Sequence, residues 1–142
     1  MVNTIHVDIV SAEGEIFSGP AKMVFLPAAE GELGIAPRHA PLLALLKAGE
    51  VRVQPVEGDE QSFYVGGGAL EVQPAKVTVL ADTAARAADL DEAAALAARQ
   101  RAEEALAGKI DRIEQAEALA ELARAAAQLK LIERLRKIRG GR

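Results

Sequence analysis

The chain has 142 residues; half of them are hydrophobic but only 3% are aromatic, and the formal net charge is −4. This length suits one ordinary domain, or a small domain with an appendage. The absence of cysteine excludes a disulfide framework and a thiolate metal site, and it fits a reducing compartment. No apolar run approaches the roughly 20 residues of a membrane-spanning helix, and the first residues lack the layout of a signal peptide. We therefore expect a soluble, cytoplasmic protein.

The charge is unevenly distributed along the chain. Residues 1–88 contain 6 Lys or Arg against 11 Asp or Glu, whereas residues 89–142 contain 11 against 10. Basic groups concentrate in the last thirteen residues, where only Glu133 opposes them. No aromatic residue follows Tyr64, so bases could not stack on this region, and an acidic protein is a poor ligand for DNA. We expect the basic end to contact an acidic protein partner.

Short strands are predicted for the first 82 residues. Ile5, Val7 and Ile9 alternate with polar residues, which is the pattern of a half-buried strand. Further strand segments are predicted at 15–18, 22–26, 50–56, 61–65, 69–72 and 76–80, with an apolar run at 42–46 that we expect to be buried. Strands at intervals of about 8 to 12 residues, separated by turn residues, indicate a β-sandwich or barrel.

Three consecutive glycines, residues 66–68, interrupt the strand pattern. They lack the Lys-Ser/Thr that follows in a phosphate-binding loop, and they lead into a strand instead of a helix. We expect a β-bulge or a close approach of two strands at this point.

The last third of the chain predicts two helices. Asp89 and Glu92 have the spacing of a capping box, and the Ala/Leu/Glu/Arg run that follows favours helix until Gly108. A polar turn at 109–112 leads into a second helix from about Ile113 to Ile138. So short a connection predicts an antiparallel helical hairpin.

Alanines at three- and four-residue spacing suggest the faces on which the two helices meet. These alanines are Ala93, Ala97, Ala105, Ala116, Ala120, Ala123 and Ala127. A methyl-lined contact gains less than a leucine-lined one, at about 0.8 kcal/mol per buried carbon, while alanine favours each helix on its own. We expect a hairpin that docks weakly and opens without losing its helices.

The stretch 29–43 reads as a shaped surface loop. It contains two glycines and two prolines, which restrict or redirect the backbone, together with Glu30, Glu32 and His39. Polar side chains on a fixed loop commonly make functional contacts. An acid/base pair or half a metal site would need a nucleophile or further ligands, and the sequence offers neither.

Several separated motifs resemble one family. The run Glu-Gly-Glu-Leu-Gly-Ile at 30–35, His-Ala-Pro-Leu-Leu at 39–43, Gly-Gly-Ala-Leu-Glu-Val at 67–72 and Val-Thr-Val-Leu-Ala-Asp-Thr-Ala at 77–84 are similar to the ε subunit of bacterial F-type ATP synthases. The resemblance covers nearly the whole chain. It implies a flattened antiparallel β-sandwich at 1–84, a linker at 85–88 and a regulatory two-helix hairpin at 89–142.

The resemblance also implies a role and partners. Such a subunit is not an enzyme: it couples the γ subunit to the c-ring on the cytoplasmic face of the bacterial inner membrane, and its hairpin inhibits ATP hydrolysis by reaching the α and β subunits. The implied c-ring contacts are Glu30, Glu32 and His39. The implied γ contacts are Ser11, His39, Leu42 and Leu43. The implied inhibitory contacts to β and α are Arg124, Lys130, Arg134, Arg136 and Lys137.

One departure from the family concerns nucleotide. Relatives that bind ATP on the hairpin carry Ile/Leu-Asp-x-x-Arg-Ala, and the matching stretch starting at Ile113 has Glu114 and Glu117 in place of Asp and Arg. A carboxylate where a triphosphate needs a cation opposes binding. We expect no cofactor, no metal and no nucleotide site.

Two other interpretations remain open from the sequence. A β-sandwich that binds a small ligand and dimerises through a coiled-coil arm would be a stable dimer, whereas a rotor subunit is expected to be a monomer when isolated; few aromatics are present to line a pocket. An enzyme that uses Glu30, Glu32 and His39 lacks a recognisable nucleophile, metal set or cofactor motif.

Overall fold

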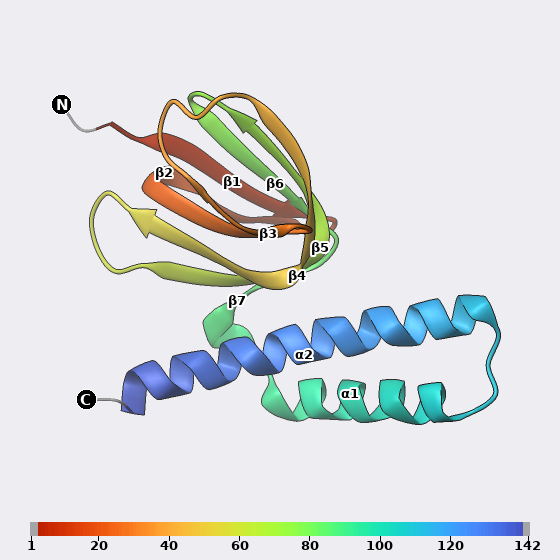
Figure 1. Ribbon diagram of the computed structural model, residues 1–142. Helices are drawn as coiled ribbons and strands as arrows, with labels where there is room; N and C mark the ends of the chain where they lie inside the picture. Colours follow the sequence, from red (N-terminus) through yellow and green to blue (C-terminus); the bar gives the residue numbers. More distant parts are fainter. Residues whose placement is uncertain (1–2, 141–142) are drawn as a thin grey trace. The chain divides into compact units, whose positions relative to one another are not determined.

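The computed structural model describes residues 3–140 and is drawn in Figure 1. The chain divides between Arg86 and Ala87 into two compact units. We call residues 3–86 the β domain and residues 87–140 the helical hairpin. Residues 85–88, expected as a linker, belong to the last strand and to a short 3₁₀ helix.

Seven strands form the β domain. They are β1 (Ile5–Ser11), β2 (Gly14–Ala28), β3 (Gly31–Ile35), β4 (Leu42–Pro55), β5 (Gln61–Gln73), β6 (Lys76–Ala81) and β7 (Ala84–Arg86). The strand order is β1-β6-β5-β4-β2-β3, β7 pairs with β5, and an additional β1–β2 pairing closes the sheet on itself. The predicted antiparallel β-sandwich is confirmed, with one parallel pairing, β1 with β6.

The main hydrophobic core of the described residues lies inside the β domain. Alternate residues of each strand point inward, and large side chains such as Phe63, Ile5 and Leu26 are completely buried. The rings of Phe17 and Phe63 pack at a centroid distance of 5.4 Å. Because no helix residue contributes to this cluster, the β domain has the core it needs to fold alone.

Several sequence expectations about strands were wrong. The segments predicted at 42–46 and 50–56 both belong to β4, those at 61–65 and 69–72 both belong to β5, and β3 runs through the stretch 29–43 that was expected to be a loop. One strand, β2, contains both segments predicted at 15–18 and 22–26. Gly19-Pro20 does not break this strand, because the pair lies where β2 pairs with β1 alone, before the pairing with β4 begins at Ala21. The run 42–46 is not buried throughout: it opens the long strand β4, so its residues alternate between two faces. Leu46 is 6% exposed, whereas Leu43 is 77% exposed.

The three glycines lie within the continuous strand β5. Gly67 and Gly68 have φ values of 102° and 139°, a region that residues with a side chain rarely adopt. A Cβ atom on Gly68 would lie 2.1 Å from the carbonyl oxygen of Leu80. The predicted close approach of strands is confirmed.

The helical hairpin contains η1 (Ala87–Asp89), α1 (Glu92–Ala107) and α2 (Arg112–Gly140). The predicted cap of the first helix was wrong by two residues: Asp91 caps α1 and accepts a hydrogen bond from the amide of Ala94 at 3.2 Å. Asp111 and Glu114 form a capping box on α2, in which Asp111 accepts from the Glu114 amide at 2.8 Å. Within residues 3–140, neither helix combines the length and apolar character needed to cross a bilayer.

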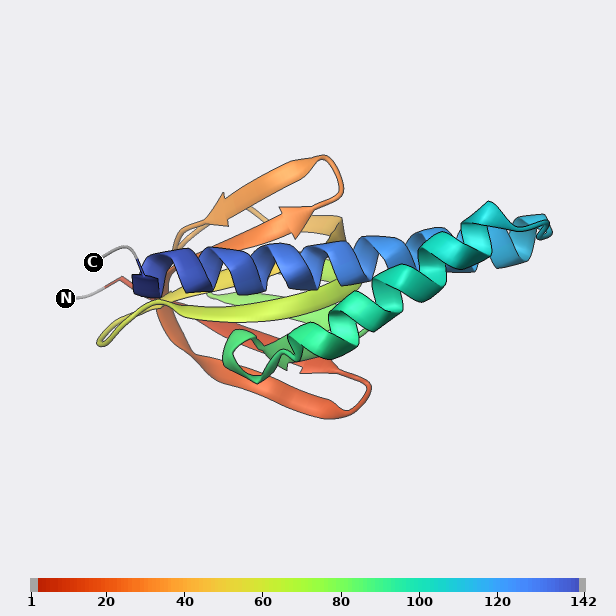
Figure 2. The same ribbon diagram turned by 90° about the horizontal axis from the view of Figure 1, so that it is seen from below.

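The two helices run side by side, as Figures 1 and 2 both show. The buried residues of the two helices are Ala95, Ala102, Ala118, Ala125 and Leu131. Ala95 and Ala125 are separated from Ile110, in the turn, by the same number of residues along the sequence. The same is true of Ala102 and Ala118, and equal separations of this kind are expected in an antiparallel hairpin.

The alanine-lined contact is confirmed in kind, but the alanines chosen from the sequence were wrong. Six of the seven named above are exposed, and Ala127 is half-buried. The buried alanines repeat every seven residues, which is two helical turns. Alanines occur on every face of both helices, so their three- and four-residue spacing did not single out the contact.

Candidate interaction surfaces

Glu30 and Glu32 lie around the turn between β2 and β3. Glu30 is exposed in the turn itself, and Glu32 is on β3, opposite Pro27 of β2. Both carboxylate oxygens of Glu32 accept from Nη2 of Arg52, at 3.3 and 3.4 Å, while 59% of its side chain stays exposed. The carboxylate is therefore paired on one side and open to a partner on the other.

Arg52, on β4, is held from three directions. Besides Glu32, its Nη1 lies 3.7 Å from the carboxylate of Glu60, and its guanidinium lies 4.4 Å from the ring centroid of Phe25. Only 26% of its side chain is exposed. Arg52 was not identified from the sequence, because strand patterns alone do not show that β3, β2 and β4 lie side by side in the sheet.

His39 lies in the loop between β3 and β4. Its Nδ1 is 2.7 Å from the carbonyl oxygen of Ala40. A carbonyl only accepts, so Nδ1 carries the proton, and in the neutral ring Nε2 is an acceptor. The preceding Arg38 has a φ of 66°, and its amide donates to the carbonyl of Pro74 at 2.9 Å, which holds the loop against the β5–β6 turn.

The predicted interface residues divide between two ends of the β domain. One row of paired residues joins Ala28, Leu46, Gly68 and Ala81, and the Glu30 turn follows at this end. Ser11, which ends β1, lies near the same end, since the preceding Val10 pairs with Leu80.

The other end of the domain is marked by Leu42, which lies about 13 Å from Leu46 along β4 and pairs with Val72. The His39 loop directly precedes Leu42. The structure does not bring Glu30 and His39 together, and Glu32 is paired with Arg52. The enzyme interpretation therefore loses the constellation on which it depended.

Exposed leucines form an apolar patch on the outer face of the β domain. Leu43, Leu45 and Leu80 are 77%, 70% and 55% exposed. Leu45 and Leu80 flank Ala69 in adjacent strands, so the patch spans β4, β5 and β6. Leu43 was among the γ contacts that the resemblance implied. Leu45 was expected to be buried with the rest of the run 42–46, and Leu80 was predicted only as part of a strand.

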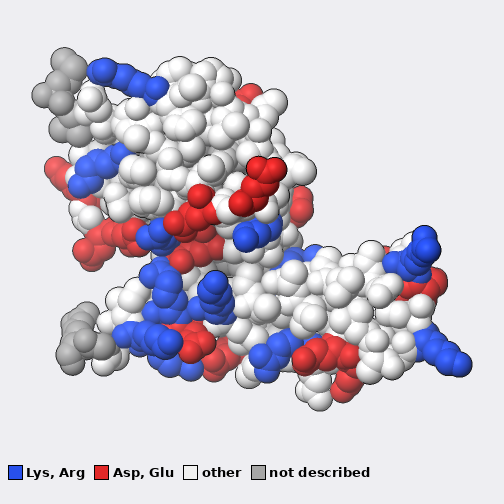
Figure 3. Space-filling model, viewed as in Figure 1, with Lys and Arg blue, Asp and Glu red and all other residues white. Residues whose placement is uncertain are grey.

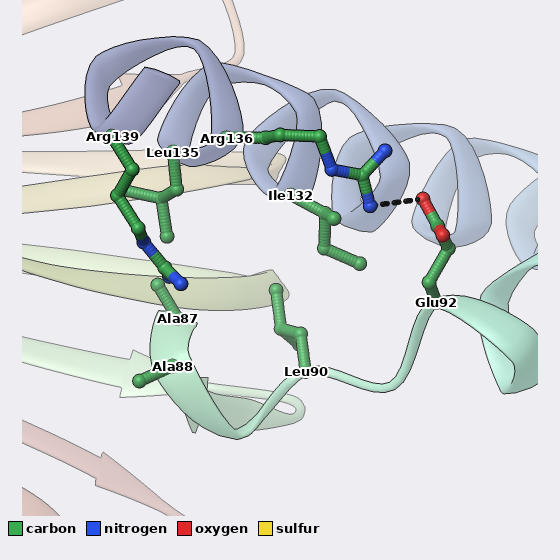
Figure 4. Close-up of a pocket in the computed structure, with 8 residues that line it drawn as sticks. All are labelled: Ala87, Ala88, Leu90, Glu92, Ile132, Leu135, Arg136 and Arg139. Carbon is green, nitrogen blue, oxygen red and sulfur yellow. Dashed lines mark hydrogen bonds and ion pairs between the residues drawn. The ribbon is translucent and has the colours of Figure 1, made fainter. Parts of the chain in front are cut away.

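Basic side chains gather near the C-terminal end of α2, as Figure 3 shows. Arg136 donates to Glu92 of α1 at 3.0 Å, a contact drawn in Figure 4, and Lys137 lies 3.5 Å from Glu133. Of the other predicted inhibitory residues, Lys130 is exposed, and Arg124 and Arg134 are half-buried. In this closed hairpin Arg136 is engaged by its own chain.

A pocket of about 300 Å³ lies within the hairpin, between η1 and the end of α2. Leu90, Ile132 and Leu135 line its apolar side, and Arg136 and Arg139 supply positive charge (Figure 4). Its remaining lining residues are Ala87, Ala88 and Glu92.

Glu114 and Glu117, which stand in place of the Asp and Arg of the nucleotide motif, lie in the first two turns of α2. Glu114 takes part in the capping box, and Glu117 is exposed. Within residues 3–140, no group of three or more His, Cys, Asp or Glu side chains is arranged to hold a metal ion.

Asp8 on β1 is the centre of a separate polar cluster. The hydroxyl of Ser18 donates to it at 2.6 Å, and Lys76 and His6 lie 3.1 and 2.9 Å from its oxygens. These contacts, the Ser18 hydrogen bond above all, hold the pKa of Asp8 below its usual value against the opposing effect of burial.

Comparison with known families decides the relationship. A family model for the ATP synthase delta/epsilon chain, beta-sandwich domain, matches residues 4–87, and one for the delta/epsilon chain, long alpha-helix domain, matches residues 88–133. The chain belongs to the ATP synthase delta/epsilon chain family. This confirms the family that the sequence motifs predicted.

Curated relatives within this family are epsilon chains. The ATP synthase epsilon chain of Nitrosococcus oceani is 66% identical over 137 residues, which is 96% of this chain and 98% of the relative. The ATP synthase epsilon chain of Alkalilimnicola ehrlichii is 62% identical over 136 residues, 96% of this chain and 97% of the relative.

Solved structures share the fold. A chain of the Euglena gracilis mitochondrial ATP synthase, in a structure of OSCP, F1 and c-ring, has a TM-score of 0.77 at 17% identity, over 87% of this chain and 78% of its own. A chain of the Tetrahymena thermophila mitochondrial ATP synthase central stalk and c-ring has a TM-score of 0.65 at 13% identity, over 90% and 96%.

Proposed function

We propose that this chain is a non-catalytic rotor subunit of an F-type ATP synthase. In this role it couples the γ subunit to the c-ring during proton-driven ATP synthesis, and its helical hairpin inhibits ATP hydrolysis. The observation that carries the proposal is the match of both units of the chain to delta/epsilon family models, together with near-full-length identity to epsilon chains.

The β domain supplies the coupling body in this proposal. Torque transfer needs a stiff element with separate contacts to two neighbours, and a closed sheet around a fully buried core meets that need. Glu30 and Glu32 are assigned to the c-ring. The patch of Leu43, Leu45 and Leu80, with Leu42 beside it, is assigned to γ, because exposed apolar patches of this kind mark protein interfaces.

His39 and Ser11 complete the proposed contacts. Nδ1 of His39 faces the carbonyl oxygen of Ala40, so Nε2 is the ring nitrogen that we assign to a polar group of γ or the c-ring. Ser11 lies at the Glu30 end of the domain, and we assign it to γ. The assembled complex would hold the chain at the cytoplasmic face of the bacterial inner membrane, without a membrane contact of its own.

The hairpin supplies the regulatory element. Its alanine-lined contact and its exposed ion pairs give the closed form a small advantage, so a second, open position lies within reach. Opening would release Arg136 from Glu92 and present it, with Arg124, Lys130, Arg134 and Lys137, to acidic groups of the β and α subunits.

Hydrolysis assays test the proposal. An αβγ complex depleted of its own ε subunit is titrated with the full chain and with a version that ends at Ala88, which retains the whole β-domain core. We expect both versions to bind γ and only the full chain to suppress hydrolysis. Suppression by both would move inhibition to the β domain, and failure of both to bind would contradict the rotor assignment.

Two inexpensive measurements address the alternatives. Sedimentation of the isolated chain should give a monomer, whereas the ligand-binding interpretation requires a dimer through residues 89–138. Calorimetry with ATP should show no micromolar binding, because Glu114 and Glu117 stand where the nucleotide motif of relatives has Asp and Arg.

A further inference from the structure

We propose that Arg52 is a positioning residue for the contact that Glu32 makes with the c-ring. This inference rests on the proposed function and adds a residue that acts through another. Arg52 itself lies on β4, two strands further from the edge of the sheet than Glu32 on β3, and would not touch the partner.

The register of three strands explains how Arg52 reaches Glu32. Gly34, Phe25 and Arg52 are paired neighbours across β3, β2 and β4. A Cβ atom on Gly34 would lie 3.1 Å from the Phe25 ring, so the glycine leaves room for that ring beside β3. The guanidinium of Arg52 lies over the ring at 4.4 Å and passes across β2 to the carboxylate on β3.

Arg52 is itself immobilised. The ring of Phe25 lies against the guanidinium. Glu60, in the loop between β4 and β5, lies 3.7 Å from Nη1. A network of this kind contributes more than an isolated surface ion pair. The fork geometry of arginine is needed, since a lysine ammonium could not stack on the ring and reach two carboxylates.

The consequence is a preorganised carboxylate on an edge strand. β3 pairs only with β2 in the sheet order, so Glu32 stands at a free edge, with 59% of its side chain exposed. Arg52 fixes the side chain before the partner arrives and removes part of the ordering cost of binding. Each carboxylate oxygen of Glu32 can accept a further hydrogen bond, so the matching c-ring group is a donor.

A double-mutant cycle tests this role. The full chain, assembled with γ, is measured for c-ring affinity as wild type, Glu32→Gln, Arg52→Gln and the double variant. We expect Arg52→Gln to weaken c-ring binding about fivefold to tenfold, to leave γ affinity unchanged, and to have no further effect in the Glu32→Gln background. Arg52→Lys should not restore full affinity, and Lys22→Gln, which removes an exposed charge from β2, should match wild type.

Each other outcome overturns the proposal in a distinguishable way. Additive losses would mean that Arg52 contacts the c-ring directly. Equal losses of γ and c-ring affinity, with a lower melting temperature, would mean a merely structural role. Unchanged c-ring binding by Glu32→Gln would remove the Glu32 contact, and a wild-type chain that binds γ but no c-ring would contradict the proposed function itself.

Discussion

The β domain and the helical hairpin are stabilised by different side chains. The β domain buries large apolar groups completely, among them Phe63, Ile5 and Leu70, inside a sheet that closes on itself. The helices of the hairpin bury four alanines and Leu131. At about 0.8 kcal/mol per buried carbon, the second contact gains far less than the first. We therefore expect the β domain to stay rigid and the helical hairpin to open more easily, with each helix intact.

The polar contacts show the same contrast. In the β domain Asp8 is 16% exposed and Arg52 is 26% exposed, and each has three partners. Across the hairpin the ion pairs Glu92–Arg136 and Arg101–Glu121 involve side chains that are 35% to 66% exposed, where such pairs contribute little. Three single variants and one double-mutant cycle test this comparison.

The largest effect is expected for Phe63→Ala. This side chain is fully buried and packs against Phe17, so its removal leaves a cavity and should lower the free energy of unfolding by about 3 to 5 kcal/mol. Urea denaturation measures the change. Leu119→Ala, an exposed position on α2, is the control and should cost well under 1 kcal/mol. A loss below 1 kcal/mol for Phe63→Ala would contradict a rigid β-domain core.

Gly68→Ala is expected to rank second. The new Cβ would meet the Leu80 carbonyl in a backbone conformation that alanine disfavours, so we expect a loss of about 2 to 3 kcal/mol. Thermal unfolding checks this result. Gly19→Ala serves as the control, because a Cβ there makes only an ordinary 3.5 Å contact with Phe17. If the two variants have the same melting temperature, the close approach of β5 and β6 does not require glycine at position 68.

Asp8→Asn should have a smaller, pH-dependent effect. Because the folded-state pKa of Asp8 is lowered, its stabilisation is present above the unfolded pKa of about 3.9 and is lost as pH falls through the folded pKa. We expect a cost of about 1 kcal/mol at neutral pH. The gap to wild type should close in acid, as followed by thermal unfolding against pH. Asp59→Asn, in an exposed loop, is the control and should unfold like wild type at neutral pH.

The smallest effect is expected across the hairpin. A cycle of Glu92→Gln, Arg136→Gln and the double variant should give a coupling of about 0.2 to 1 kcal/mol, which added salt reduces. Fluorescence transfer between probes on α1 and α2 reports the population of open hairpin. A coupling of several kcal/mol would contradict the view that the hairpin opens readily.

The sequence predicted the fold class because its signals are local. Period-two alternation, turn residues at regular spacing and a change to helix-forming residues near residue 89 are all readable along the chain. The parallel β1–β6 pairing and the closure of the sheet were not predictable in this way, since both join segments far apart in sequence. The face of the hairpin was ambiguous because alanines occur on every side.

The sequence indicated which residues could form the candidate sites but not how these residues are arranged in space. Glu30, Glu32 and His39 were read as one loop, whereas β3 runs through that stretch and separates the turn from His39. Arg52 went unnoticed because only the pairing of β2 with both β3 and β4 places it beside Glu32. Leu45 was expected to be buried and Leu80 was only placed in a strand, since an apolar residue in a short strand does not reveal which face it occupies.

A reversible lock on the hairpin tests the central claim most directly. Because the chain has no cysteine, Ala95→Cys and Ala125→Cys introduce the only thiols, at buried positions of α1 and α2. Hydrolysis by the αβγ complex is measured with the oxidised and the reduced variant. We expect the oxidised chain to bind γ normally but to lose most of its inhibition, and reduction to restore it. Equal inhibition by both forms would contradict an opening hairpin as the regulatory element.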